Sequence, residues 1–129
     1  MEPHVFMRKW LEAVTHGPLD ALAELTANDI VFRMPFAPPG GIQEVKGWDR
    51  TSEMLQYVWT AFPEFAWHDI VTRRVEGDPE LYVTTTRSTA RKSDGQPYGN
   101  TYVMLTRVRD GQVVEHTEYY NPLALLPRT

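Results

Sequence analysis

Residues 98–120, YGNTYVMLTRVRDGQVVEHTEYY, contain two runs of alternating residues on either side of Asp110-Gly111. Both runs are rich in Val, Thr and Tyr, which suit the pleated surface of a sheet. Asp-Gly between two such runs is a strong signal for a tight hairpin. The stretch therefore predicts two long antiparallel strands, over residues 98–109 and 112–120.

The sequence before this hairpin continues the same pattern. Residues 65–75 and 81–90 read as two further strands, and the intervening Gly77-Asp78-Pro79 reads as a turn. Ser93-Asp94-Gly95 turns the chain again before residue 98. Consecutive strands that are joined by tight turns pair antiparallel, so the second half of the chain predicts a four-stranded antiparallel sheet.

The first half is predominantly helical in pattern. Apolar residues recur at helical spacing after Pro3 until Gly17, and Pro18 begins a second apolar stripe. Asn28-Asp29 indicates a turn before a strand at 30–34, residues 35–41 a loop, and 46–48 a short extended piece. Asp49 is a good N-cap for a third helix that runs to about Thr60.

This element order predicts an α+β fold in which a curved antiparallel sheet wraps around the three helices of the N-terminal half. A strongly bent sheet that closes over helices leaves a cavity at its open end. We therefore expect residues 1–129 to form one cone-shaped domain with a single pocket.

Composition excludes several classes of function. The net charge is −4 and no stretch gathers Lys and Arg into a patch, which disfavours nucleic-acid binding. There is no cysteine, and His4, His16 and His68 show no metal-ligand spacing with Asp or Glu, so we expect no metal. No phosphate-binding loop implies a nucleotide cofactor, and none is expected. With no signal peptide and no apolar run of membrane-spanning length, we expect a cytoplasmic protein without membrane contact.

The last predicted strand contains the side chains that are best suited to acid–base chemistry. Side chains alternate along a strand, so His116, Glu118 and Tyr120 share one face. A carboxylate, an imidazole and a phenol together make an acid–base group. Burial in an aromatic pocket disfavours the charged form of a carboxylate, so Glu118 could exchange a proton near neutral pH. The alternative is that this face is polar because it meets solvent.

Three segments of the chain resemble a known family. They are Phe62–Trp67, Asn100–Val113 and Glu118–Asn121. Together with the element order they are similar to the SnoaL-like, ketosteroid-isomerase-like (nuclear transport factor two-like) superfamily, and within it to the condensing proteins of phenazine biosynthesis. The resemblance implies that Glu118 lies in the pocket and acts as proton donor. It also implies a homodimer, because members of this superfamily usually pair through the outer faces of their sheets.

The sequence departs from the family at its other catalytic positions. Met34 stands where ketosteroid isomerase has its Asp base, and no carboxylate lies near Tyr102 to Met104, where that enzyme has its oxyanion-stabilising Asp. Met54 stands where the phenazine-type proteins have a helix His. Steroid isomerisation by those residues is therefore excluded.

The remaining candidates are wall residues. Arg87 could bind a substrate carboxylate if it faced the pocket, although an exposed Arg on a sheet is commoner. Tyr120 and His116 are either assistants of Glu118 or pocket wall. The other candidate ligand contacts are Tyr102, Asn100, Met54, Trp59 and Trp10, of which the tryptophans are more often core.

These observations favour a cofactor-independent isomerase, cyclase or condensing enzyme, with Glu118 as general acid–base and His116 assisting. Its ligand would be small, cyclic and carbonyl-bearing. The alternatives are a non-catalytic small-molecule binding protein and a dimeric scaffold of the same fold, because fold does not fix function.

Overall fold

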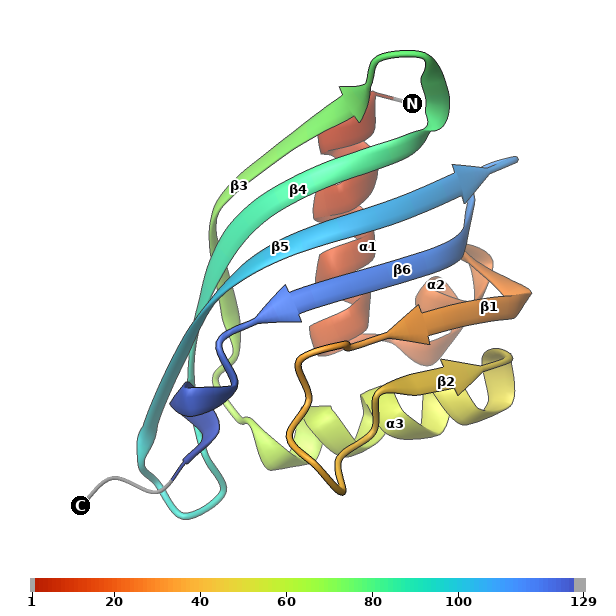
Figure 1. The fold of residues 1–129 in the computed structure, drawn as a ribbon. Helices are drawn as coiled ribbons and strands as arrows, with labels where there is room; N and C mark the ends of the chain where they lie inside the picture. The colour runs from red at the N-terminus through yellow and green to blue at the C-terminus, as the bar shows by residue number, and fades with distance from the viewer. Residues whose placement is uncertain (1, 127–129) are drawn as a thin grey trace.

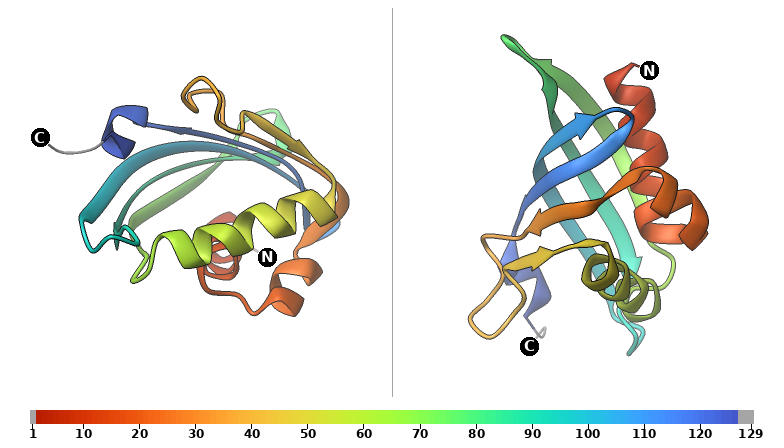
Figure 2. Two further views of the ribbon diagram at one scale, coloured as in Figure 1. Left: turned by 90° about the horizontal axis from the view of Figure 1, so that it is seen from below. Right: turned by 90° about the vertical axis from the view of Figure 1, so that its right-hand side faces the viewer.

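A curved six-stranded sheet forms one layer of the molecule, and three helices cover its concave face (Figures 1 and 2). The computed structural model describes residues 2–126. The helices are α1 (Pro3–His16), α2 (Leu19–Glu24) and α3 (Trp48–Ala61), and a short 3₁₀ helix, η1, spans Pro122–Leu125. The strands are β1 (Thr26–Arg33), β2 (Glu44–Lys46), β3 (Ala66–Val75), β4 (Asp78–Arg91), β5 (Pro97–Arg109) and β6 (Gln112–Tyr120). The predicted α+β class is confirmed.

The strand order is β2-β1-β6-β5-β4-β3. The four strands of the C-terminal half pair antiparallel in chain order, as the turn signals predicted. The expectation of a wholly antiparallel sheet was wrong at one junction, because β1 and β6 pair in parallel. The two strands lie about eighty residues apart in the chain. No hairpin turn therefore constrains their direction.

Strand β1 begins before the turn that was predicted at Asn28-Asp29. Both residues lie exposed within β1, at the point where its register against β6 shifts between Thr26 and Val31. An irregular strand accommodates turn-forming residues because its side chains there need no packed neighbour. The third helix likewise begins earlier than expected, at Trp48.

The core lies between the concave face and the helices. Alternate residues of β4 and β5 are buried, and they face α1 and α3. The fully buried Trp10 of α1 donates its indole N–H to the Thr26 hydroxyl at 3.2 Å. This hydrogen bond satisfies the one polar atom of a large apolar side chain and fixes α1 against the start of β1.

Gly17 makes the tight connection between α1 and α2. Its φ is 68°, and an added Cβ would lie 3.1 Å from the ring of Trp59 on α3. Only glycine has both the conformational freedom and the absence of a side chain that this junction requires. The end of α1 therefore packs directly against α3.

Candidate active site

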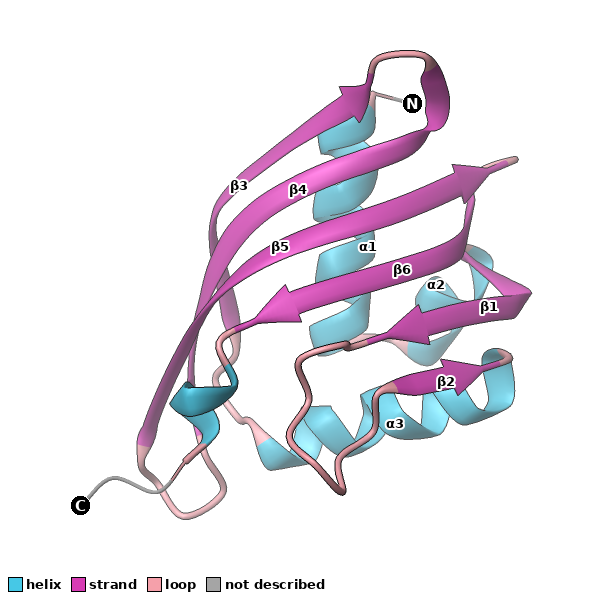
Figure 3. Ribbon diagram, in the orientation of Figure 1, coloured by secondary structure: helices cyan, strands magenta, loops and turns pink. Residues whose placement is uncertain are grey.

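A cavity of about 310 Å³ lies between the concave face of the sheet and α3. This is the lower end of the size range of small-molecule sites. Six structural parts contribute to it: the inner face of β1, β3, β5 and β6, the end of α1, the α3 helix, the connection between α3 and β3, the loop from Met34 to Ile42 between β1 and β2 (Figure 3), and Leu125 of η1. Its walls are predominantly apolar and aromatic, and they include Phe32, Met34, Met54, Phe62, Phe65, Trp67, Tyr98, Tyr102 and Tyr120.

Glu118 brings a single carboxylate into this cavity. It projects from β6, opposite Met104 of β5, and its side chain is only 16% exposed. Among the described residues that line the cavity there is no Asp, Lys, Arg or His. A ligand that exchanges a proton with this carboxylate therefore meets few other polar side chains of the wall that compete for that proton.

His116 lies directly behind Glu118 and is fully buried. Its Nε2 is 3.3 Å from Oε1 of Glu118, and its Nδ1 is 2.8 Å from the hydroxyl oxygen of Thr106. The rings of Trp10 and Phe32 lie 4.6 and 4.8 Å away, centroid to centroid. The imidazole is thus held in one orientation by two hydrogen bonds and two aromatic rings.

This arrangement is compatible with two proton distributions. When Glu118 is ionised, Nε2–H donates to the carboxylate and Nδ1 accepts from the Thr106 hydroxyl. When Glu118 is protonated, it donates to Nε2 and Nδ1–H donates to Thr106. A hydroxyl can act as donor or acceptor, so both ring nitrogens stay hydrogen-bonded in either state.

Three tyrosines surround the carboxylate. The Tyr102 hydroxyl lies 2.7 Å from the Ser88 hydroxyl, and the Tyr98 hydroxyl accepts from the Asn100 side chain at 2.8 Å. Burial raises the pKa of Tyr98, Tyr102 and Tyr120, and for all three the charge of Glu118 acts in the same direction. The three phenols therefore remain protonated hydrogen-bond donors at neutral pH.

The structure brings four of the nine predicted site residues to the cavity surface: Glu118, Tyr120, Tyr102 and Met54. Three others lie behind it. His116 and Trp10 are buried beneath Glu118, and the Trp59 indole N–H donates to the backbone carbonyl of Val14. These three side chains support the wall without forming it.

Asn100 was predicted to contact the ligand, but it has a structural role instead. It is buried, and its amide bonds the backbone of Asn121 in both directions, at 3.0 Å as donor and 2.8 Å as acceptor. The alternation of β5 directs the Asn100 side chain inward, as predicted. The C-terminal turn covers this side chain, so it does not reach the cavity surface. Asn100 therefore fixes η1, and through it Leu125, against the cavity.

The placement of Arg87 in the pocket was wrong. Arg87 alternates outward on β4 and is half exposed, where its Nε donates to Asp69 at 2.7 Å. Thr86 and Ser88, its neighbours in sequence, occupy the inner face. No arginine is available to bind a substrate carboxylate within the described cavity lining.

The sequence reasoning missed much of the aromatic wall. Phe65 immediately precedes β3 and Trp67 lies at its start, where Trp67 packs edge-on against Tyr102 at 5.1 Å between ring centroids. In the sequence, the Phe62–Trp67 segment indicated the family but was not assigned to the pocket. Its alternation of Phe65 and Trp67 on one face was the signal that could have placed both rings in the cavity.

Comparison with known proteins identifies the family. A family model described as the SnoaL-like domain matches residues 7–116. The chain belongs to the SnoaL-like family. Its relatives include YesE, an uncharacterised protein of Bacillus subtilis, which is 24% identical over 127 residues that cover 92% of this chain and 81% of YesE.

Solved structures share the fold. A Pseudomonas putida protein named as a candidate polyketide cyclase superposes with a TM-score of 0.80 at 16% identity, covering 97% of this chain and 96% of that protein. A phenazine biosynthesis-related protein from Pseudomonas aeruginosa gives a TM-score of 0.75 at 15% identity, covering 98% and 86%. At these identities the likeness establishes the SnoaL-like architecture alone.

Two further findings concern the described residues. Between residues 2 and 126, no three His, Asp or Glu side chains gather closely enough to hold a metal ion. Over the same range, no helix is both long enough and apolar enough to cross a membrane.

Proposed function

We propose that this SnoaL-like protein is a cofactor-independent enzyme that isomerises, cyclises or condenses a small carbonyl compound by proton transfer. The observation that carries this proposal is the Glu118 carboxylate, which stands alone in an apolar cavity and is hydrogen-bonded to the buried His116. An enclosed carboxylate that can be protonated or ionised without leaving a buried partner unsatisfied is suited to general acid–base catalysis.

Each residue of the site has a separate role in this mechanism. Glu118 removes a proton from the carbon next to the carbonyl and returns it at another position of the ligand. His116 does not touch the ligand; it orients the Glu118 carboxylate and donates a hydrogen bond to it when it is ionised. Tyr102 and Tyr120 line the same cavity as protonated phenols, and they would donate hydrogen bonds to the oxygen where negative charge develops.

The family relationship supports the same class of reaction. One structural neighbour is named as a candidate polyketide cyclase and another as phenazine biosynthesis-related. Both names concern the synthesis of ring-containing small molecules. Carried over to this chain, they favour a cyclic substrate.

The test is proton exchange, because it needs no knowledge of the natural substrate. Cyclic and aryl ketones are incubated with the protein in D₂O, and loss of the signal from the C–H next to the carbonyl is followed by ¹H NMR. We expect the protein to accelerate exchange, and Glu118→Gln to reduce this acceleration by about 100-fold or more. Glu115→Gln is the matched control, since Glu115 lies three residues away on the same strand and pairs with Arg33 outside the cavity.

Acceleration that persists in Glu118→Gln would remove the assignment. A second candidate, a non-catalytic binding protein, is favoured by Met34 and Met54, which line the cavity at the two positions where related enzymes carry ionisable groups. Ketones that bind in the cavity without any accelerated exchange would establish that alternative.

A further inference from the structure

The ligand of this cavity can be defined more narrowly by its charge and polar groups. Building on the proposed function, we infer that the cavity takes an uncharged, largely apolar ring compound that presents acceptor oxygens, and that it rejects ligands bearing a carboxylate or phosphate. Three features of the cavity lead to this inference: its lack of cations, its surplus of hydrogen-bond donors, and its aromatic walls.

The first feature is the absence of any positive charge in the described lining. An anionic ligand would have to leave water for a cavity whose one charged side chain is the carboxylate of Glu118. Like charges held close together in a poorly solvated site repel strongly, and an unpaired charge is costly to bury. His116 cannot offset this repulsion by contact, because it is fully buried behind Glu118.

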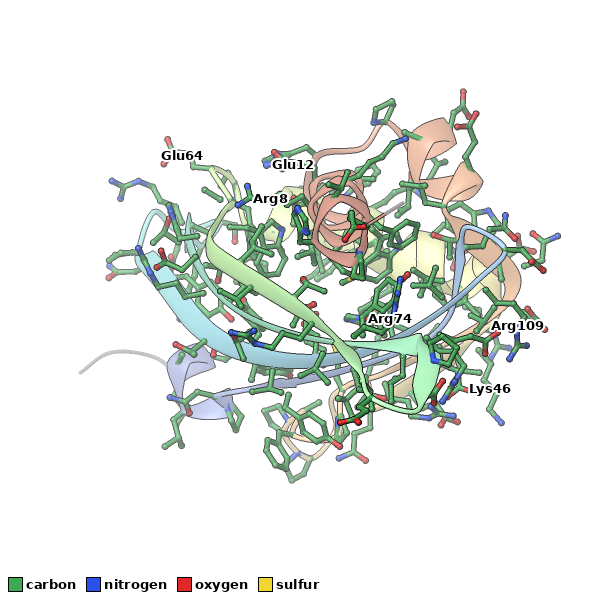
Figure 4. The ribbon with its side chains drawn as sticks, turned by 90° about the horizontal axis from the view of Figure 1, so that it is seen from above. Arg8, Glu12, Lys46, Glu64, Arg74 and Arg109 are labelled. Carbon is green, nitrogen blue, oxygen red and sulfur yellow. The ribbon has the colours of Figure 1, made fainter. Side chains whose placement is uncertain are left out.

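The basic side chains near the sheet are engaged elsewhere. Arg33 is bound to Glu44 and Glu115, and Arg87 is bound to Asp69, on the outside of the molecule. Lys46 and Arg109 lie at the molecular margin in Figure 4. None of these residues lines the cavity, so none can reach a ligand anion there without leaving its position.

The second feature is a surplus of donors. No protein group within the described residues hydrogen-bonds the Tyr120 hydroxyl, and burial keeps this phenol protonated by raising its pKa. The Tyr98 hydroxyl accepts from Asn100 and also interacts with the Tyr102 hydroxyl, so its proton goes either to Tyr102 or to a ligand. Donors of this kind need acceptor oxygens such as those of a ketone, quinone or ether. An organic cation, which offers no acceptor, would leave the Tyr120 donor unsatisfied.

The third feature is the shape and surface of the walls. The rings of Phe62, Phe65 and Trp67 line the cavity together with the side chain of Met54 on α3. At the rim, Ile42 is 53% exposed and Tyr57 is 72% exposed, so the apolar surface continues to the entrance. Flat apolar rings fit such walls, and the rim allows a larger ring system to extend outward.

The experiment uses three ligands of one shape that differ in charge: the methyl ketone of naphthalene, naphthoate and naphthylmethylammonium. Affinities are measured at neutral pH by titration calorimetry on the full chain. We expect the ketone to bind and naphthoate to bind at least about tenfold more weakly. Glu118→Gln should raise the affinity for naphthoate more than that for the ketone, because it removes the repulsion. Glu115→Gln should change neither.

Binding is located by NMR of the methionine methyl groups, where the signals of Met34 and Met54 should shift. Equal affinities for ketone and naphthoate, tighter binding of the ammonium ligand, no binding of the ketone, or binding that shifts neither methionine would each overturn the inference. The methyl ketone also carries exchangeable protons. If it binds selectively but does not exchange them faster, the proposed catalysis fails while the assignment of the ligand class stands.

Discussion

At the residue scale, the site depends on how few polar atoms it contains. Among the described residues, the His116 imidazole has two hydrogen-bond partners, Thr106 and Glu118, and it has no exposure to solvent. Both nitrogens of the buried imidazole stay hydrogen-bonded when a proton moves along the chain of Thr106, His116 and Glu118. The movement therefore costs little free energy. The same pattern on an exposed strand would exchange protons with water and would not direct them to a ligand.

The buried tyrosines make the stability of the protein sensitive to alkaline pH. Burial raises the pKa of Tyr102 in the folded state, whereas in the unfolded state it ionises near pH 10. The unfolded state then binds fewer protons, so the free energy of unfolding falls as pH rises above about 10. One such group contributes a slope of at most about 1.4 kcal/mol per pH unit.

We expect Tyr102→Phe to unfold in urea with a clearly smaller alkaline slope than the wild-type chain. Its absolute stability at neutral pH should be lower, because the hydrogen bond to Ser88 is lost. Tyr57→Phe is the control, since Tyr57 is 72% exposed, and it should follow the wild-type slope. Identical slopes for the wild type and Tyr102→Phe would contradict this account.

At the element scale, Asn100 joins β5 to the C-terminal turn. Its side chain makes hydrogen bonds to the Tyr98 hydroxyl, the Thr101 amide and both backbone groups of Asn121. Because η1 carries Leu125 into the cavity lining, Asn100 links the sheet to the element that closes the cavity at this end.

Replacing Asn100 should therefore loosen η1 selectively. We expect Asn100→Ala to cost about 1–3 kcal/mol in the free energy of unfolding, since it leaves buried groups without partners. It should also increase hydrogen exchange at the Leu123 amide, which the Asn121 side chain caps at 3.0 Å. Asn28→Ala, at an exposed position of β1, is the matched control. Unchanged exchange at Leu123 would show that η1 is held by its apolar contacts instead.

The four C-terminal strands were predictable because alternation and turn residues are local signals. Burial of alternate residues along β4 and β5 follows the sequence pattern closely. The parallel pairing of β1 with β6 was not predictable in this way, because it depends on packing between segments far apart in the chain. Turn-forming residues at 28–29 also misled the prediction, since a bulged strand tolerates them.

The candidate site was predictable to the same extent. Alternation placed Glu118, His116 and Tyr120 on one face, and the structure shows that this face is the concave one. The sequence alone could not predict which of these residues reach the cavity surface. His116 is covered by Trp10 and Phe32, and Asn100 by the C-terminal turn; both coverings arise from other elements of the fold.

At the scale of the whole molecule, the outer face of the sheet carries a row of uncharged side chains. Strand pairing sets Val71, Thr85, Val103 and Tyr119 side by side across β3 to β6, and Phe36 packs on Tyr119 at 5.3 Å between ring centroids. Val71 is 45% exposed and Val103 is 43% exposed. We call these five residues the outer row.

We propose that two copies of the chain pair through the outer row. A stable pair needs roughly 800 Å² of surface on each partner, and apolar side chains at its centre with charged groups around them. Here Arg87 with Asp69 and Arg107 with Asp78 form ion pairs on flanking positions, where two copies could align without burying an unpaired charge. The helices cover the opposite face and leave the outer row as the continuous uncharged surface of the sheet.

Sedimentation velocity should then give twice the mass of one chain, and Val103→Lys should reduce it to the mass of one. A lysine at the centre of the interface would be buried opposite the same residue of the partner and would meet a like charge. Val5→Lys is the matched control, because Val5 is equally exposed, at 45%, but lies on α1. A wild-type protein that sediments as a monomer would exclude the pairing, and a Val103→Lys variant that remains a dimer would move the interface to another face.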